Sequence, residues 1–210
     1  MTPLSDLLAN AQLRSGELSE LASGTVISGT CFKSGDRCSA QWVDLDLERC
    51  KFSDVDLSQS RSANMALLEV LFCRGSMCNT AWRGARMRQI EFQRSRLTGI
   101  SFVESTIRST ILDHCKCDLS VFHDSKLEQC TFRECDLREV DFQNAQLNRV
   151  TFRDCDLRGG RFPSAKLHEV DFRGSQLEGI FIESDQLKGN TVDPSQLKSF
   201  SELLGLIVSH

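Results

Sequence analysis

Cysteine and histidine are the residues of this 210-residue chain best suited to bind a metal or to act as nucleophiles. The ten cysteines include Cys115 and Cys117, but a single residue separates this pair, and no second pair follows at the distance seen in zinc fingers. The four histidines are far apart in sequence: His114, His123, His168 and His210. We therefore predict no metal site and no cofactor, and we interpret the cysteines mainly as small side chains of the core.

Short motifs that position catalytic groups are also missing from the sequence. It contains no GxSxG turn for a serine nucleophile, no P-loop for a nucleotide phosphate and no dinucleotide-binding fingerprint. The histidines are interpreted as exposed polar side chains. We therefore predict that the protein is not an enzyme.

Charge and hydropathy narrow the classes of partner. The formal net charge is −4, with both signs interspersed, which disfavours direct binding to nucleic acid or to a membrane surface. The acidic excess lies in residues 106–210. No apolar stretch is long enough to span a bilayer, and the first twenty residues do not resemble a secretory signal. Reduced cysteines and a cytoplasmic location are expected.

A five-residue repeat determines which elements must position these side chains. Every fifth residue from Phe32 to Leu197 is apolar except Arg37 and Ser62, although only 40% of the chain is hydrophobic. A second series, two residues earlier in each unit, holds mostly small residues. This period fits neither a helix nor a plain strand. Three extended residues followed by two at a corner would point both series inward.

Four such units would close a coil of twenty residues, and coils would stack at the ~4.8 Å spacing of paired strands. About eight coils fit between residues 30 and 197. Side chains ten residues apart would then lie on opposite walls, so alternating phenylalanine and leucine would each line two walls. The predicted core residues are Phe122, Leu127, Phe132, Leu137, Phe142, Leu147, Phe152 and Leu157.

Quintets such as CDLRE, VDFQN and AQLNR resemble the A-(D/N)-L-x-x consensus of the pentapeptide-repeat family. The resemblance covers roughly residues 30–197 and implies an all-β fold, a right-handed quadrilateral β-helix. We expect a solenoid over residues 30–192 and a C-terminal helix and tail over residues 193–210. Residues 1–29 are expected to form either a degenerate first coil or a short capping helix.

The C-terminal segment begins with a typical α-helix start, with Asp193 at the N-cap, Pro194 after it and Gln196 at the third helical position. This helix either caps the last coil or forms a two-fold dimer. The ending VDPSQLKSFSELLGLIVSH resembles the tail of topoisomerase-protecting members, namely quinolone-resistance proteins, their mycobacterial relative and the microcin B17 immunity protein. That resemblance implies a homodimer formed through Leu197, Phe200, Leu203, Leu204, Leu206 and Val208.

The same resemblance implies a function. Such a protein binds DNA gyrase or another type II topoisomerase and protects it from a quinolone or a natural-product poison, through mimicry of DNA. The predicted partner-binding residues are the outward acids Asp118, Asp136, Glu139, Asp156 and Glu178. A solvated face of mixed charge is the alternative, because Arg138 and Arg158 lie beside them. The alternative function is a structural adaptor or effector scaffold that binds another protein.

Overall fold

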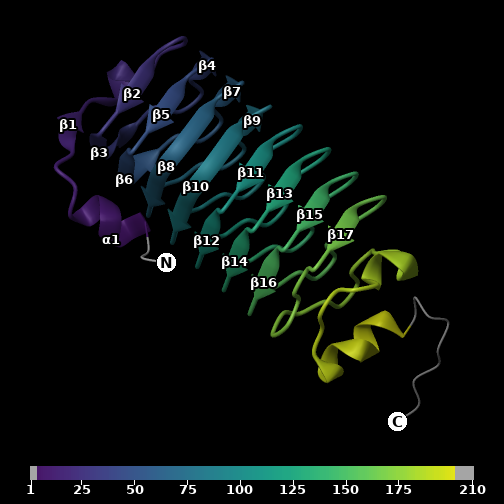
Figure 1. Ribbon diagram of the computed structural model, residues 1–210. Helices are drawn as coiled ribbons and strands as arrows, with labels where there is room; N and C mark the ends of the chain where they lie inside the picture. The colour runs from purple at the N-terminus through teal and green to yellow at the C-terminus, as the bar shows by residue number, and fades with distance from the viewer. Residues whose placement is uncertain (1–3, 202–210) are drawn as a thin grey trace.

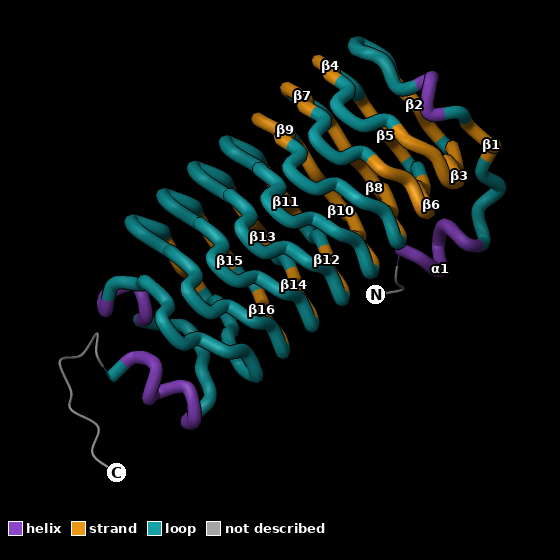
Figure 2. The backbone as a smooth tube through the Cα atoms, turned by 180° about the vertical axis from the view of Figure 1, so that it is seen from behind, coloured by secondary structure: helices purple, strands orange, loops and turns teal. Residues whose placement is uncertain are grey.

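The chain is a parallel β-solenoid of about eight turns, seen in a computed structural model that describes residues 4–201. The coils stack along one axis, as Figure 1 and Figure 2 show from opposite sides. The predicted fold class is thereby confirmed. No helix within residues 4–201 is long and apolar enough to cross a membrane.

Most sides of the coils are short strands, and a few short helices lie at the two ends of the described chain. The strands are β1 (Arg14–Gly16), β2 (Val26–Ser28), β3 (Thr30–Asp36), β4 (Gln41–Val43), β5 (Asp46–Glu48), β6 (Lys51–Asp56), β7 (Arg61–Ala63), β8 (Ala66–Cys73), β9 (Ala81–Arg83), β10 (Arg86–Gln93), β11 (Thr106–Arg108), β12 (Ile111–Asp113), β13 (Lys126–Glu128), β14 (Thr131–Arg133), β15 (Gln146–Asn148), β16 (Thr151–Arg153) and β17 (Lys166–His168). The helices are α1 (Leu4–Ala9) and the 3-10 turns η1 (Leu18–Glu20), η2 (Ser184–Leu187) and η3 (Pro194–Phe200).

From β2 onward, coils pair at a constant offset of twenty residues, as in the pairing of Phe132 with Phe152 between β14 and β16. The backbone N–H of Asp136 donates to the carbonyl of Cys115 in the preceding coil at 3.0 Å. The next N–H, that of Leu137, donates to the carbonyl of Asp156 in the following coil at 2.8 Å. Each side is therefore bonded to both neighbouring coils, and every side chain lies over its counterpart twenty residues away.

The interior is a set of side-chain stacks along the axis. The rings of Phe132 and Phe152 stack with centroids 5.0 Å apart, and Phe152 stacks on Phe172 at 5.4 Å. Phe142, from the opposite wall, meets Phe152 edge to face at 5.9 Å. The predicted placement of phenylalanine on two facing walls is confirmed. All eight predicted core residues between residues 122 and 157 are buried.

The two exceptions to the apolar series have structural reasons. Arg37 is exposed, so its charge remains in water. Ser62 is buried in register between Trp42 and Trp82. Two indoles on either side of one position fill the space that a third large side chain would need, so a small residue fits there.

Each corner depends on a left-handed backbone conformation. From Phe32 to Leu177, the residue two positions after the central residue of each unit has positive φ, for example 54° at Gln129, 49° at Glu134 and 55° at Glu139. Such conformations cost about 1 kcal/mol or more for residues other than glycine and persist only where neighbouring structure holds them. Here the corner N–H of Glu139 donates to the carbonyl of Arg158 at 3.0 Å. Coil-to-coil hydrogen bonds therefore hold the corners.

The N-terminal segment combines a partial coil with a helix. Strand β1 pairs in parallel with β3 and so extends the solenoid by one side. Helix α1 lies along the flank of the rod against β8 and β10 rather than over its open end (Figure 1). The N–H of Ser5 donates to the carboxylate of Glu91 at 3.1 Å, and Leu8 is buried in this contact.

Two glutamines close the C-terminal end. In η3 the side-chain amide of Gln196 donates to the carbonyls of Phe172 and Ser175, at 2.7 and 2.6 Å. In η2 the amide of Gln186 makes the same pair of bonds to Phe162 and Ala165. At Ser175 and Ala165 the side-chain amide therefore replaces the backbone N–H that a further coil would supply.

The helix type differs from the prediction. Asp193 is at the N-cap and Pro194 follows it, as predicted, but residues 194–200 form a 3-10 helix instead of an α-helix. Gln196 must reach two carbonyls of the last coil while its oxygen accepts the N–H of Asp193 at 2.7 Å. This tertiary contact holds the segment as a tight turn against the rod.

Replacing Gln196 with leucine tests this capping role. The Gln196→Leu variant keeps a similar volume but leaves the Ser175 carbonyl without its donor and the Phe172 carbonyl with only the N–H of Ser175, so we expect about 1–3 kcal/mol of lost stability. Urea unfolding at neutral pH measures it. Gln143→Leu, on the exposed outside of the rod, is the control. Equal midpoints for the two variants would contradict the capping role.

Candidate functional site

The interior leaves no room for a substrate. Its side chains fill the square, and the gap between residues such as Met87, Phe102 and Leu127 has a volume of only about 10 Å³. A ligand-binding cavity is usually tens of times larger. Any function of the described rod therefore belongs to its outer surface.

The predicted partner-binding acids occupy one side of successive coils. Asp136 and Asp156 are direct neighbours across two coils, and Lys116 precedes them in the same row. Asp118 and Glu178 occupy the next outward row, and Glu139 lies at the adjoining corner. We call these five residues, Asp118, Asp136, Glu139, Asp156 and Glu178, the acidic face.

Arginines neutralise two of these acids. Arg138 contacts Asp136 through two nitrogens, at 2.7 and 2.8 Å, and Arg158 contacts Asp156 at 2.6 and 2.8 Å. Hydrogen bonds from these guanidinium groups lower the pKa of Asp136 and of Asp156. Both carboxylates are therefore charged at neutral pH, but each is balanced by its own arginine.

These paired aspartates also shape the corner. The Oδ1 atom of Asp136 accepts the backbone N–H of Arg138 at 3.3 Å, and Asp171 does the same for Arg173 at 3.1 Å. An aspartate just before the central apolar residue thus bonds the backbone two residues later. Its recurrence in quintets such as CDLRE has a structural cause, and it does not by itself indicate a partner.

The remaining acids of this face are more available. Asp118 accepts a hydrogen bond from the Thr98 hydroxyl at 2.7 Å. Glu139 and Glu178 are exposed and form no ion pair among residues 4–201. Leu119, next to Asp118, is 51% exposed at a left-handed corner. The sequence analysis missed it; its signal is an apolar residue at a position that otherwise holds polar residues or glycine.

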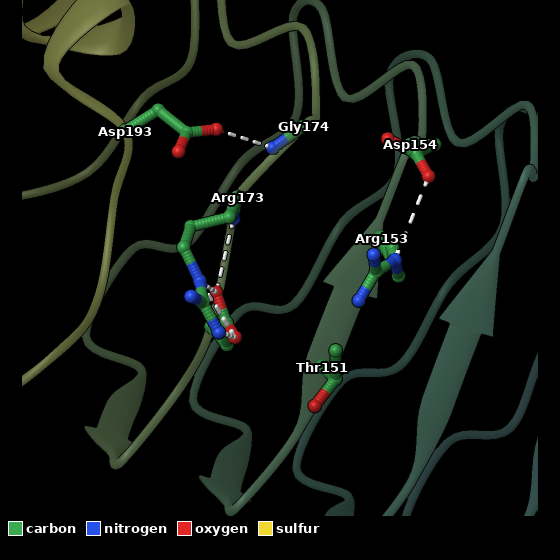
Figure 3. A pocket seen from close by; sticks show the side chains of 7 residues that line it. Thr151, Arg153, Asp154, Arg173, Gly174 and Asp193 are labelled. Carbon is green, nitrogen blue, oxygen red and sulfur yellow. Dashed lines mark hydrogen bonds and ion pairs between the residues drawn. The ribbon is translucent and has the colours of Figure 1, made fainter.

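A shallow hollow near the C-terminal end has mixed charge (Figure 3). Arg173 is paired with Asp171 at 2.7 Å, and Asp193 accepts the N–H of Gly174 at the same distance. Arg153 lies 3.7 Å from Asp154. Because these polar groups are already paired with one another, we assign no ligand to this hollow.

The histidines are not brought together. His114 lies between Asp113 and Glu134, with nitrogen–oxygen distances of 3.2 and 2.9 Å, whereas His123 contacts Asp141 on another side of the coil. His168 lies on a third side, and His210 is outside the described residues. Within residues 4–201 no group of three or more His, Cys, Asp or Glu side chains has an arrangement suited to a metal ion.

The predicted dimerisation residues divide into three groups. Leu197 is 58% exposed on η3. Phe200 is buried in the core of the same chain, so it packs beneath the cap and is not free to contact a partner. Leu203, Leu204, Leu206 and Val208 lie outside the described residues.

Comparison with protein families matches the model of the pentapeptide repeat region to residues 105–182 and 125–199. These residues are a pentapeptide repeat region. In the structure the same twenty-residue pairing continues toward the N-terminus as far as the pairing of β2 with β5. The sequence matches no curated protein in a direct comparison.

Solved structures share the pentapeptide-repeat fold over most of the chain. Trypsin-treated QnrB1, a plasmid-mediated fluoroquinolone resistance protein, is similar with a TM-score of 0.52 and 17% sequence identity, over 95% of this chain and 98% of that chain. HetL, a pentapeptide repeat protein involved in heterocyst differentiation regulation in the cyanobacterium Nostoc, has a TM-score of 0.52 and 14% identity, over 90% and 92% of the two chains. At these identities the likeness establishes the fold.

Six of the ten cysteines of the chain are buried, and all ten are unpaired thiols. Cys115 and Cys135 belong to one inward column and interact with each other, and Cys117 lies beside them. Burial raises the pKa of the Cys117 thiol well above its ordinary value, and it raises the pKa of Cys130 to about 11. The thiols of Cys117 and Cys130 are therefore neutral and shielded, as core residues would be.

The shifted thiols predict a loss of stability in alkali. The unfolded Cys130 thiol loses its proton near pH 8.5, whereas the folded one retains it up to about pH 11. The stabilisation of the folded state by the buried neutral thiol is therefore complete below about pH 8.5 and is lost as the pH rises toward 11. Urea unfolding measures the free energy of unfolding at each pH. Over this range it should fall less in Cys130→Ala than in the wild type, by roughly 2–3 kcal/mol. Cys73→Ala, with its thiol on the outside, should follow the wild type, and indistinguishable variants would contradict the prediction.

Proposed function

We propose that this protein is a non-catalytic binding rod whose partner is DNA gyrase or another type II topoisomerase. On this proposal it protects the enzyme from a quinolone or a natural-product poison. The observation that carries the proposal is the filled interior, which leaves only a long outer surface for function. It is supported by the fold shared with QnrB1, a fluoroquinolone resistance protein, along nearly the whole chain.

DNA mimicry, as part of this proposal, concerns the acidic face. Among residues 4–201, the carboxylates of that face that form no ion pair with an arginine are Asp118, Glu139 and Glu178, all in the C-terminal half. Because Asp136 and Asp156 are neutralised locally, these three would supply the field that a DNA-binding surface meets. Leu119 adds an apolar contact in the same region.

A C-terminal homodimer completes the proposed assembly. Leu197 is exposed at the end of the rod, and the apolar residues Leu203, Leu204, Leu206 and Val208 follow it in the sequence. A two-fold contact there would join two rods end to end and place both acidic faces near the centre. The unpaired state of all ten cysteines supports a reducing compartment, so we place the protein in the cytoplasm.

A structural adaptor that binds another protein is the second candidate. HetL, which is described as acting in the regulation of differentiation, matches this chain with the same TM-score as QnrB1. The solenoid alone therefore does not distinguish between the two classes of partner.

Supercoiling of relaxed plasmid by bacterial DNA gyrase, with and without ciprofloxacin, separates these candidates. We expect the purified protein to restore supercoiling in the presence of the drug and to co-purify with gyrase. Glu139→Lys combined with Glu178→Lys should weaken this effect several-fold, because both substitutions reverse unpaired charges of the acidic face.

The matched control carries Asp44→Lys and Asp124→Lys, which reverse the same charge at exposed corners elsewhere. This control should restore supercoiling as the wild type does.

Light scattering tests the proposed dimer, and the Leu197→Asp variant should have the mass of a monomer. Protein that neither restores nor inhibits supercoiling and does not co-purify with gyrase would leave the adaptor as the function.

A further inference from the structure

One coil of the rod has a concentration of positive charge that the acidic face does not explain. Residues 81–100 contain five arginines and one acid: Arg83, Arg86, Arg88, Arg94, Arg96 and Glu91. Glu91 is buried under α1, and Arg83 is paired with Glu104 at 2.6 Å. Arg86 and Arg88 are exposed and form no ion pair among residues 4–201. Two free guanidinium groups therefore lie on one strand, β10.

These two arginines border a groove on the flat side formed by β2, β5, β8, β10 and β11, which lie side by side in Figure 1. The groove also has an apolar part. Val26 is 73% exposed, and Ala66 and Leu68 point outward in β8 although an outward position usually holds a polar residue. We call this surface the arginine groove, formed by Val26, Ala66, Leu68, Arg86, Arg88 and Arg108.

The placement of these charges is unfavourable for the isolated rod. Arg88 lies directly opposite Arg108 in the parallel pairing of β10 with β11. Like charges at such positions destabilise a sheet. Glu128 neutralises Arg108 at 3.0 Å, but Arg88 has no such partner among the described residues. A negatively charged group from another molecule would relieve this repulsion.

We propose that the arginine groove binds an acidic segment of a partner protein that also carries apolar side chains. Guanidinium groups pair with carboxylates in a bidentate geometry, and the exposed Val26 and Leu68 provide contacts for apolar side chains. Asp46 and Glu48 line the same hollow, but Ala66 and Leu68 separate them from Arg86 and Arg88. A peptide can place carboxylates over the arginines and apolar side chains over the rest of the hollow, whereas a phosphate backbone carries negative charge along its whole length, so the surface fits a peptide better than a nucleic acid.

This groove and the acidic face belong to opposite sides of the coil, because Arg108 and Asp118 are ten residues apart in a twenty-residue turn. The two surfaces can therefore be occupied at the same time. The inference holds whether the partner at the acidic face is a topoisomerase or another protein.

A fluorescein-labelled peptide, (Glu-Glu-Leu-Leu)3, is the probe, and its anisotropy is measured with the full-length protein at low salt. We expect saturable binding that weakens as salt is added. Arg86→Glu combined with Arg88→Glu should weaken binding at least tenfold, and Leu68→Ser should weaken it about threefold. A peptide of the same pattern with lysine in place of glutamate should not bind.

The matched control is Lys126→Glu with Lys166→Glu, which reverses two exposed charges on the same side but outside the groove. It should bind the acidic peptide within twofold of the wild type. Circular dichroism melting shows that each variant is folded, and Arg86→Gln with Arg88→Gln repeats the test without charge reversal. The proposal would be overturned if the arginine and the lysine double variants lost peptide affinity equally, or if the wild type did not bind the peptide. Tighter binding of a twelve-base-pair duplex than of the peptide would also overturn it.

Discussion

Backbone hydrogen bonding between coils, at a constant twenty-residue offset, is the constraint on which the rest of this molecule depends. One N–H in each unit donates to the preceding coil and the next donates to the following coil, as at Asp136 and Leu137. This pattern requires a left-handed corner every five residues, which non-glycine side chains adopt at some cost. It also places each side chain over the equivalent side chain of the neighbouring coil, so that Phe132, Phe152 and Phe172 form one stack. The stacked interior repays the strain of the corners through buried apolar area.

The same constraint decides where function can lie. Because both inward positions of a unit are filled, side chains are free to vary only at the outward positions and at the corners. Some of these are still used by the fold: Asp136, Asp156 and Asp171 each bond the backbone of their own corner. Glu139, Leu119 and Arg88 are examples of exposed residues whose side chains do not bond the backbone of a corner. Such residues are specific to this rod and are not required by the fold. On the proposed function, a partner would contact these residues.

The five-residue phase made the solenoid and its core predictable from sequence, because a period of five fits neither of the simple elements. The ion pairs of Asp136 with Arg138 and of Asp156 with Arg158 follow from the Asp-x-Arg spacing, since residues two apart in a strand lie on the same side. The placement of α1 on the flank was not predictable, because it depends on Glu91, more than eighty residues away. Nor was the 3-10 cap, whose form is set by the carbonyls that Gln196 must reach. The buried state of Phe200 has the same cause, since the turn folds back over the last coil.

The most direct test exchanges one inward and one outward residue without changing composition. Phe142 is fully buried and Gln143 is exposed, so swapping the two places a phenylalanine in water and a glutamine in the core. The account predicts a loss of about 4 kcal/mol or more in urea unfolding, from the cavity and the buried amide together. Swapping Gln143 with Asn144, both outward, should change stability by less than about 1 kcal/mol. Similar small losses for the two swaps would show that the five-residue phase does not determine which side chains form the core.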